Sequence, residues 1–217
     1  MNLLKPEAIL FDWDNTLVDS WTIIFDALNF TLESFGKEPW SITQTKTRVR
    51  KSLRDSFPDI FGERWKQAAE IFYERFDDIH ISRLTPIKGA QKMLKEIHEQ
   101  KIFLGVVSNK RGDYLRKEVH HLGWGKYFSS LVGATDAEKD KPSPEPVALA
   151  LSDCAHKSGG HIWFVGDANI DMECAHNADL TPILLRKPAP NHEEFTDYPP
   201  AFHILDCQAL SNLVKKM

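Results

Sequence analysis

The sequence predicts an α/β protein with a doubly wound, mostly parallel sheet and a separate helical cap subdomain. Short apolar runs rich in β-branched and aromatic residues recur along most of the chain, and helical stretches separate them. The runs are nearly continuous in their apolar character, which is typical of strands covered on both faces in a parallel sheet. Strand and helix in regular alternation indicate a doubly wound sheet. One long segment breaks this alternation and predicts the cap.

Six segments are predicted to be strands because each is a short β-branched or aromatic apolar run. They lie at residues 8–11, 102–107, 130–134, 162–165, 182–185 and 202–205. Four segments between them are predicted to be helices, at residues 88–100, 112–122, 143–155 and 170–178. The proline-rich polar stretch 186–200 is predicted to be a surface loop.

Residues 19–85 contain no strand-like run. Between residues 65 and 79, apolar side chains recur at steps of three and four residues, which puts them on one face of a helix. These side chains are Trp65, Ala69, Phe72, Phe76 and Ile79. Pro86 and Gly89 mark a boundary before the sheet pattern resumes. We therefore predict an α/β core domain from residues 1–18 and 86–217, and a helical cap from residues 19–85.

Composition sets limits on partners and location. The chain has 217 residues, of which 42% are apolar, and its net charge of −4 gives no general attraction to nucleic acid or to acidic membranes. Its three cysteines are too few and too scattered for a disulfide framework, which favours a reducing compartment. The chain shows no signal-peptide pattern and no apolar run of about eighteen residues. These observations predict a cytoplasmic protein that binds neither a nucleic acid polymer nor a membrane, and they leave its oligomeric state open.

The ends of the predicted strands carry the polar side chains that suggest chemistry, because ligands bind at the carboxyl ends of strands in parallel α/β sheets. These side chains are Asp12, Asp14 and Thr16 after the first strand, Ser108 and Asn109 after the second, Lys141 after the third, and Asp167 and Asp171 after the fourth. Four carboxylates that lie close together repel one another unless they share a cation, so the set predicts a divalent metal ion. Ligands that are all oxygen favour Mg²⁺ over zinc.

This set of groups fits phosphoryl transfer. An aspartate carboxylate is a competent nucleophile toward phosphorus when a metal ion and a lysine neutralise the incoming phosphate, and a second carboxylate can donate a proton to the leaving alcohol. Positioning and charge neutralisation then supply most of the catalysis. A D-x-D-x-T pattern alone more often marks a solvated turn or a helix cap. The other three groups of residues also lie at predicted strand ends, and their joint occurrence favours the functional interpretation.

Four stretches together resemble a known family. FDWDNTLVDS, VVSNK, KDKPSPEP and GDANIDMECA are similar to the four motifs of the haloacid dehalogenase-like hydrolase superfamily, in the order and spacing of its phosphoglycolate phosphatase-like branch. The motifs span residues 11–175. The resemblance implies a Rossmann-like core, a helical cap inserted after the first strand, and a phosphoric monoester hydrolase that acts on a small phosphorylated metabolite.

The resemblance also implies roles for individual residues. Asp12 would be the nucleophile that forms an aspartyl-phosphate, and Asp14 would act as general acid and then as general base. Mg²⁺ would be held by the Asp12 carboxylate, the Asp14 backbone carbonyl and Asp167. Asp171 would support the metal site through water molecules or through Lys141. Lys141 would stabilise the nucleophile and the developing charge.

The resemblance further implies that Ser108, Thr16 and Asn109 bind the phosphoryl group. Ser108 is also a candidate N-cap for the helix that follows, whose N-terminus would be an anion site. Two positions depart from the commonest form of the first motif. Trp13 stands where a smaller or aliphatic residue is frequent, and we expect it to pack on the cap or to narrow the cleft. Asn15 stands where glycine is frequent, and asparagine tolerates the left-handed backbone that the turn needs.

Other functions share many of these residues. A dehalogenase of the same superfamily needs neither Asp14 nor Asp167, so their presence argues against it. A phosphomutase shares every residue named, and a phosphonate hydrolase would add a Schiff-base lysine from the cap. A non-catalytic binding protein on the same fold is favoured only if one of the site residues is lost, and all are present.

The predicted cap contains the basic run KTRVRKSLR at residues 46–54. We interpret most of this run as a solvated helix face. Arg48 and Arg50 are hypothetical contacts to an anionic substrate.

Overall fold

The computed structural model describes residues 4–49, 51–155, 158–190 and 193–217. It divides the chain into two compact units. The core unit consists of Met1–Val18 and Pro86–Met217, and the cap unit consists of Asp19–Thr85. Where the chain passes between these units, the two-residue strands β2 (Val18–Asp19) and β3 (Thr85–Pro86) form a small sheet.

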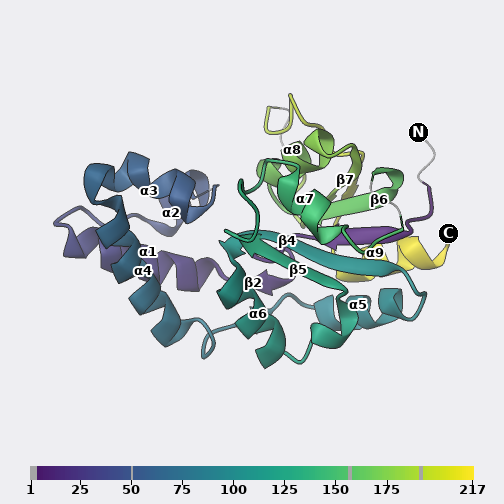
Figure 1. Cartoon of the computed structure of the whole chain (residues 1–217), viewed down its shortest axis with the longest axis horizontal. Helices are drawn as coiled ribbons and strands as arrows, with labels where there is room; N and C mark the ends of the chain where they lie inside the picture. Colours follow the sequence, from purple (N-terminus) through teal and green to yellow (C-terminus); the bar gives the residue numbers. More distant parts are fainter. Residues whose placement is uncertain (1–3, 50, 156–157, 191–192) are drawn as a thin grey trace. The chain divides into compact units, whose positions relative to one another are not determined.

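The core unit is built on a six-stranded parallel sheet in the order β5-β4-β1-β6-β7-β8 (Figure 1). The strands are β1 (Ala8–Phe11), β4 (Phe103–Arg111), β5 (Ser130–Ala134), β6 (Gly159–Gly166), β7 (Leu180–Leu185) and β8 (Phe202–Ile204). Every predicted strand has its counterpart, and the predicted doubly wound α/β fold is confirmed. The strand order places β1 between β4 and β6, so the chain winds outward in both directions from the centre of the sheet.

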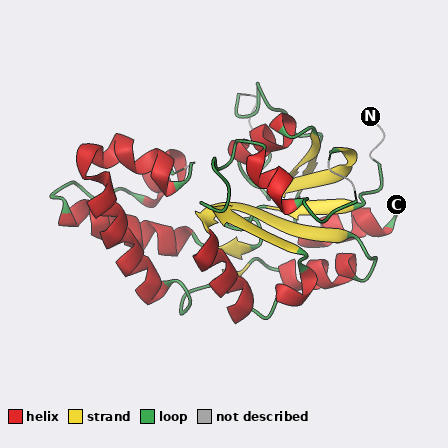
Figure 2. Ribbon diagram, in the orientation of Figure 1, coloured by secondary structure: helices red, strands yellow, loops and turns green. Residues whose placement is uncertain are grey.

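Helices cover both faces of this sheet (Figure 2). They are α5 (Ala90–His98), α6 (Gly112–His121), α7 (Glu145–Ala150), α8 (Asn169–Asn177) and α9 (Cys207–Lys215). Side chains of α7 and α8 share one hydrophobic cluster with β1, β4, β5 and β6. The four residues of β1 have no exposed surface, which agrees with their continuous apolar character.

Several elements of the core differ from the sequence prediction. Strand β4 continues to Arg111, so that Ser108 and Asn109 lie within it and not after it, and β6 is longer than predicted. Helix α7 ends at Ala150 instead of reaching residue 155, because Ser152 and Asp153 are weak helix formers that prefer the turn found there. Helix α9 was not predicted, and the side chain of Asp206 caps it by accepting a hydrogen bond from the Ala209 amide at 2.9 Å. The stretch 186–200 forms neither helix nor strand among its described residues, although Phe195 is buried in it.

The cap unit is helical, as its sequence pattern indicated. Its helices are α1 (Trp21–Ser34), α2 (Ile42–Arg48), α3 (Leu53–Phe61), a 3-10 turn η1 (Gly62–Arg64) and α4 (Trp65–Ile79). Phe72 and Phe76 of α4 are buried, and the Phe57 and Phe72 rings meet edge to face at 5.6 Å. The buried alanine of α4 is Ala68, whereas the predicted Ala69 is only half-buried.

The basic run divides between a helix end and the residues beyond it. Arg48, in the last turn of α2, lies over the Trp40 ring with its guanidinium carbon 4.6 Å from the ring centroid. Lys46 lies 5.5 Å over the Trp21 ring. Arg50 lies outside the described residues, and contact of Arg48 or Arg50 with a substrate stays a hypothesis.

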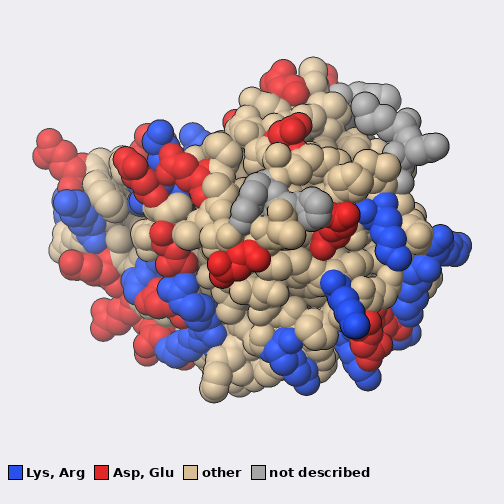
Figure 3. Space-filling model, turned by 45° about the vertical axis from the view of Figure 1, so that its right-hand side comes forward, with Lys and Arg blue, Asp and Glu red and all other residues tan. Residues whose placement is uncertain are grey.

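Surface charge and helix lengths bear on the predicted partners. On the face drawn in Figure 3, acidic and basic side chains of the described residues both occur across the surface and no continuous basic patch covers it. None of the helices found in the described part of the chain combines the length and the apolar character that crossing a bilayer would require.

Candidate active site

The predicted site residues of the core unit lie at the carboxyl ends of its central strands. Strand β1 pairs in parallel with β4 and β6, so that Phe11 aligns with Val106 on one side and with Val165 on the other. Asp12 follows Phe11 directly, and its amide donates a 2.8 Å hydrogen bond to the Val165 carbonyl. Parallel pairing on both sides of β1 therefore brings residues distant in the sequence to one edge of the sheet.

A tight turn follows β1. Asn15 has a φ of 65°, the left-handed conformation expected for it, and its amide donates to the Val18 carbonyl at 2.6 Å. The Thr16 hydroxyl lies 3.2 Å from Asp12 Oδ2 and 3.4 Å from Asp167 Oδ1, and its single proton is shared between these two acceptors. In the structure Thr16 thus links two carboxylates, and its part in phosphate binding stays a prediction.

Lys141 is buried between two carboxylates. Its Nζ lies 2.6 Å from Asp12 Oδ1 and 2.7 Å from Asp171 Oδ1, and its side chain is 2% exposed. Burial alone would lower the pKa of this ammonium group, but the charges of Asp12 and Asp171 raise it above its ordinary value. Lys141 is therefore a permanent cation beside the predicted nucleophile.

The side chain of Asn109 fixes the backbone of Lys141. Its Nδ2 donates to the Lys141 carbonyl at 3.1 Å, and its Oδ1 accepts from the Lys141 amide at 3.0 Å. Ser108 is buried in β4, and its Oγ accepts a hydrogen bond from the Lys110 amide at 3.1 Å. Because α6 begins only at Gly112, with Arg111 as its N-cap, the interpretation of Ser108 as a helix cap is wrong. Phosphate binding by Ser108 and Asn109 stays a prediction.

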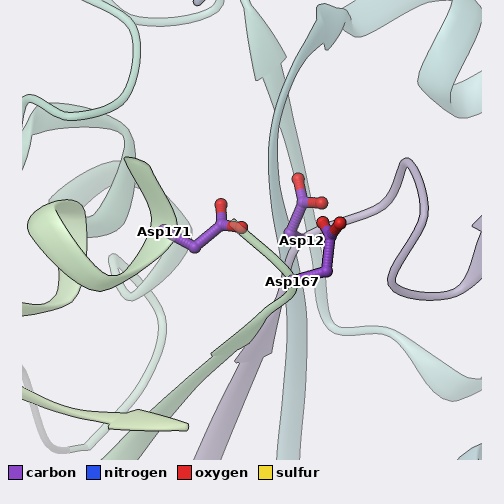
Figure 4. A group of neighbouring side chains, drawn as sticks. All are labelled: Asp12, Asp167 and Asp171. Atoms are coloured by element: carbon purple, nitrogen blue, oxygen red, sulfur yellow. The ribbon is translucent and has the colours of Figure 1, made fainter. Parts of the chain in front are cut away.

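Three carboxylates gather where β1, β6 and α8 meet. Asp12, Asp167 and Asp171 each offer an oxygen, and these oxygens lie within 4.8 Å of one another. Figure 4 shows the side chains of Asp12 and Asp167 side by side and that of Asp171 directed toward them from α8. A side chain at Gly166 would collide with the Asp171 side chain, so this position requires glycine. Asp171 is further fixed by a 3.1 Å hydrogen bond from the Ala168 amide to its Oδ2.

The electrostatics of this cluster indicate a cation site. Burial and the nearby charge of Asp171 raise the pKa of Asp12 to about 7, although Lys141 opposes the shift. Burial and the charges of Asp171 and Asp12 likewise hold the pKa of Asp167 well above its ordinary value. The single positive charge of Lys141 therefore does not balance the negative charges of the three carboxylates. A divalent cation bound by oxygen would relieve this repulsion, so the donor set fits the predicted metal ion.

Asp14 has a partner that the sequence analysis missed. Lys110 Nζ lies 2.7 Å from Asp14 Oδ1, and the same ammonium donates to both carboxylate oxygens of Glu118, at 2.9 and 2.7 Å. Burial would lower the pKa of Lys110, but Asp14 and Glu118 raise it above its ordinary value. Glu118 lies on the buried face of α6 with Leu115 and Val119. The sequence signal that could have identified Glu118 is an acidic residue within the apolar face of a helix.

Trp13 lies inside the core unit. The indole is fully buried, packs edge to face on Trp124 with 5.8 Å between ring centroids, and donates from Nε1 to Glu118 Oε2 at 2.6 Å. The expectation that Trp13 packs on the cap or narrows the cleft is therefore wrong. A buried tryptophan needs an acceptor for its N–H group, and here Glu118 is that acceptor.

Comparison with known proteins assigns the family. The family model described as haloacid dehalogenase-like hydrolase matches residues 9–185, which include every predicted site residue. The chain belongs to the haloacid dehalogenase-like hydrolase family. The predicted family, the predicted fold and the prediction of an enzyme of the hydrolase class are thereby confirmed.

Relatives of this hydrolase carry more specific names. It is 25% identical over 177 residues to a pyrophosphatase PpaX of Halalkalibacterium halodurans, with 82% of each chain covered. It is 26% identical to a phosphoglycolate phosphatase of Pseudomonas fluorescens, over 94% of this chain and 78% of that protein. Among solved structures, a hydrolase of this family from Streptococcus pneumoniae superposes with a TM-score of 0.84 at 18% identity, over 98% of this chain and 99% of that one. That last likeness supports the fold alone.

Proposed function

We propose that this hydrolase is a Mg²⁺-dependent phosphatase that cleaves a small phosphate monoester through an aspartyl-phosphate on Asp12. The observation that carries the proposal is the arrangement around Asp12. A buried carboxylate lies in contact with Lys141 and within 4.8 Å of two further carboxylates, at the carboxyl end of the central strand β1. The relatives named as phosphatases support the same reaction class.

The proposed reaction has two steps at phosphorus. An oxygen of Asp12 attacks the phosphorus atom, and the bond from phosphorus to the leaving oxygen breaks while Asp14 donates a proton to that oxygen. Asp14, now a carboxylate, then accepts a proton from a water molecule that attacks the aspartyl-phosphate, which releases phosphate and restores Asp12. Lys141 lowers the charge repulsion between Asp12 and the incoming phosphate in both steps.

A metal ion bound by the carboxylate cluster would support this chemistry beside Asp12. Asp12, Asp167 and the Asp14 backbone carbonyl would hold the ion, and Asp171 would act on the site through its contact with Lys141. When bound, Mg²⁺ supplies positive charge that orients the phosphoryl group and neutralises its oxygens.

The proposed substrate is a small phosphorylated metabolite. The chain's relatives are named for phosphoglycolate and for pyrophosphate, so both compounds belong in a first panel with sugar phosphates and nucleotides. Phosphate release should require Mg²⁺ and should stop when a chelator is added. A purified, folded chain that releases no phosphate from any of these compounds with Mg²⁺ would contradict the proposal. The predicted cytoplasmic location stays a prediction.

The proposed metal site predicts that Mg²⁺ stabilises the folded chain by an amount that depends on pH. The pKa of Asp12 is raised from 3.8 to about 7 in the folded chain without Mg²⁺. Between these two pH values, Asp12 is therefore protonated in the folded chain and ionised in the unfolded chain. Its free energy of unfolding therefore falls as pH rises through this window, and Mg²⁺ competes with protons for the same carboxylates. At a hundredfold excess over its Kd, Mg²⁺ should add about 2.7 kcal/mol, or roughly 5–10 °C in Tm, at pH 8 and much less at pH 5.

Thermal denaturation with and without Mg²⁺ at the two pH values measures this effect. Asp167→Asn, which removes one proposed ligand, should reduce the Mg²⁺-dependent rise in Tm at pH 8. Equal rises in Tm at both pH values would contradict the assignment of the site.

A further inference from the structure

A buried polar network connects the first motif to helix α6. Trp13 and Glu118 are separated by 105 positions in the sequence, both have no exposed surface, and the indole N–H donates to the Glu118 carboxylate at 2.6 Å. Trp124, itself 1% exposed, holds the Trp13 ring by edge-to-face packing. The orientation of the Glu118 carboxylate is thus fixed by a side chain that packing immobilises.

The network ends at Asp14. Lys110 donates to both oxygens of Glu118, and its Nζ is 2.7 Å from Asp14 Oδ1. A lysine ammonium on its flexible stem is usually mobile, yet here a buried carboxylate holds it at one place. Contact at Oδ1 leaves Oδ2 of Asp14 as the oxygen that can carry the transferred proton.

Packing alone does not account for this arrangement. Replacing a buried ion pair with apolar side chains of similar volume is often neutral or stabilising, so an apolar residue at position 118 would serve the core of α6 as well. What an apolar residue would not do is hold a cation against Asp14. Proton transfer needs the donor oxygen within hydrogen-bond reach of the leaving oxygen, and a misplacement of about 1 Å can cost a hundredfold in rate.

We propose that Glu118 and Lys110 are positioning residues, which, with Trp13, hold the Asp14 carboxylate in the orientation for proton transfer to the leaving oxygen. This inference rests on the proposed phosphatase function. It adds to that function a contact chain from Trp13 through Glu118 and Lys110 to Asp14, and it explains why a tryptophan stands between the two aspartates of the first motif.

The test compares two leaving groups. An alkoxide leaving group needs the proton from Asp14, whereas p-nitrophenolate is weakly basic and leaves with little protonation. Glu118→Gln keeps the shape of the side chain and an acceptor for Trp13 but removes the charge that holds Lys110.

With enzyme in excess over substrate, the rate of leaving-group release in a single turnover reports the first step alone, free of the second step in which Asp14 is the base. We expect Glu118→Gln to lower this single-turnover rate about ten- to a hundredfold for the alkyl phosphate that the wild-type chain hydrolyses fastest among phosphoglycolate, glycerol phosphate and glucose 6-phosphate. For p-nitrophenyl phosphate the loss in the single-turnover rate should be under about threefold, and the concentration that half-saturates this step should stay unchanged for both substrates.

A charge-neutral double variant guards against loss of folding. Lys110→Met alone leaves Glu118 as an unpaired buried charge, whereas Lys110→Met combined with Glu118→Gln removes both charges. The double variant should show the same selective loss in the single-turnover rate for the alkyl phosphate. Glu96→Gln is the matched control, because Glu96 is also a core-unit carboxylate, bonded to Lys215 at 2.9 Å and to Ser211. Glu96→Gln should leave the ratio of the two single-turnover rates unchanged.

The outcomes separate the two claims. Equal losses in the single-turnover rate for both substrates in Glu118→Gln and in the double variant, or a change in the half-saturating concentration alone, would overturn the positioning role while leaving the phosphatase function intact. A wild-type chain that hydrolyses none of these esters with Mg²⁺ would overturn the proposed function, and the positioning role with it.

Discussion

Replacing Asp12 with asparagine is expected to lower kcat for phosphate release by on the order of 10⁴-fold or more, because the variant has no nucleophile for phosphorus. Asparagine has nearly the same shape, so the loss comes from chemistry rather than from packing. Asp12 is 6% exposed and lies at the centre of the carboxylate cluster, where loss of one negative charge also lowers repulsion on Asp167 and Asp171. The folded state should therefore persist.

Steady-state kinetics and circular dichroism together measure this effect. The control is Asp153→Asn, because Asp153 is an exposed aspartate of the turn that follows α7. It should keep full activity. An Asp12→Asn variant that still released phosphate at more than a few per cent of the wild-type rate would refute the assigned nucleophile.

Replacing Lys141 with methionine is expected to reduce both stability and activity. Methionine matches the length of the lysine stem but leaves the carboxylates of Asp12 and Asp171 buried without their shared cation. Removing one partner of a buried ion pair costs about 3–5 kcal/mol, which corresponds to a fall in Tm of roughly 6–20 °C for a chain of this size. Activity should fall on the order of 10²–10³-fold, because the charge beside the attacking oxygen is lost.

A nearby lysine provides the control. Lys139 lies two positions earlier, its side chain is 70% exposed, and its ion pair with Glu145 at 3.7 Å is open to solvent. Lys139→Met should change the free energy of unfolding by less than about 0.5 kcal/mol. Added Mg²⁺ should restore part of the stability of Lys141→Met but not its activity. If Lys139→Met and Lys141→Met behaved alike, the paired-charge account of the site would be wrong.

Much of the fold could be predicted because its signals are local. Continuous apolar runs such as residues 8–11 identify buried parallel strands, and their alternation with amphipathic stretches identifies the doubly wound sheet. Helix ends were less predictable. Helix α7 stops early because turn-forming residues follow it, and α9 depends on a cap at Asp206 and on packing against α5, neither of which the apolar pattern reveals.

The site was predictable where strand ends deliver charged groups, and unpredictable where side chains meet across the sheet. That Asp12, Lys141 and Asp171 lie in contact follows from the topology once the strands are known. The contact of Trp13 with Glu118 depends on how α6 packs on the sheet, which no spacing in the sequence encodes. The same holds for the 3.2 Å hydrogen bond to the Asp167 carbonyl that is donated by Arg186, the residue directly after β7.

Detection of the phosphoryl group on Asp12 tests the central claim most directly. Asp14→Asn removes the base for the second step but still permits the first step with p-nitrophenyl phosphate, whose leaving group needs little protonation. With Mg²⁺ this variant should release a burst of p-nitrophenolate equal to the enzyme concentration. After acid quench, mass spectrometry of the peptide containing Asp12 should then show one added phosphoryl group. Steady turnover without a burst, or a phosphoryl group on any other residue, would contradict the account.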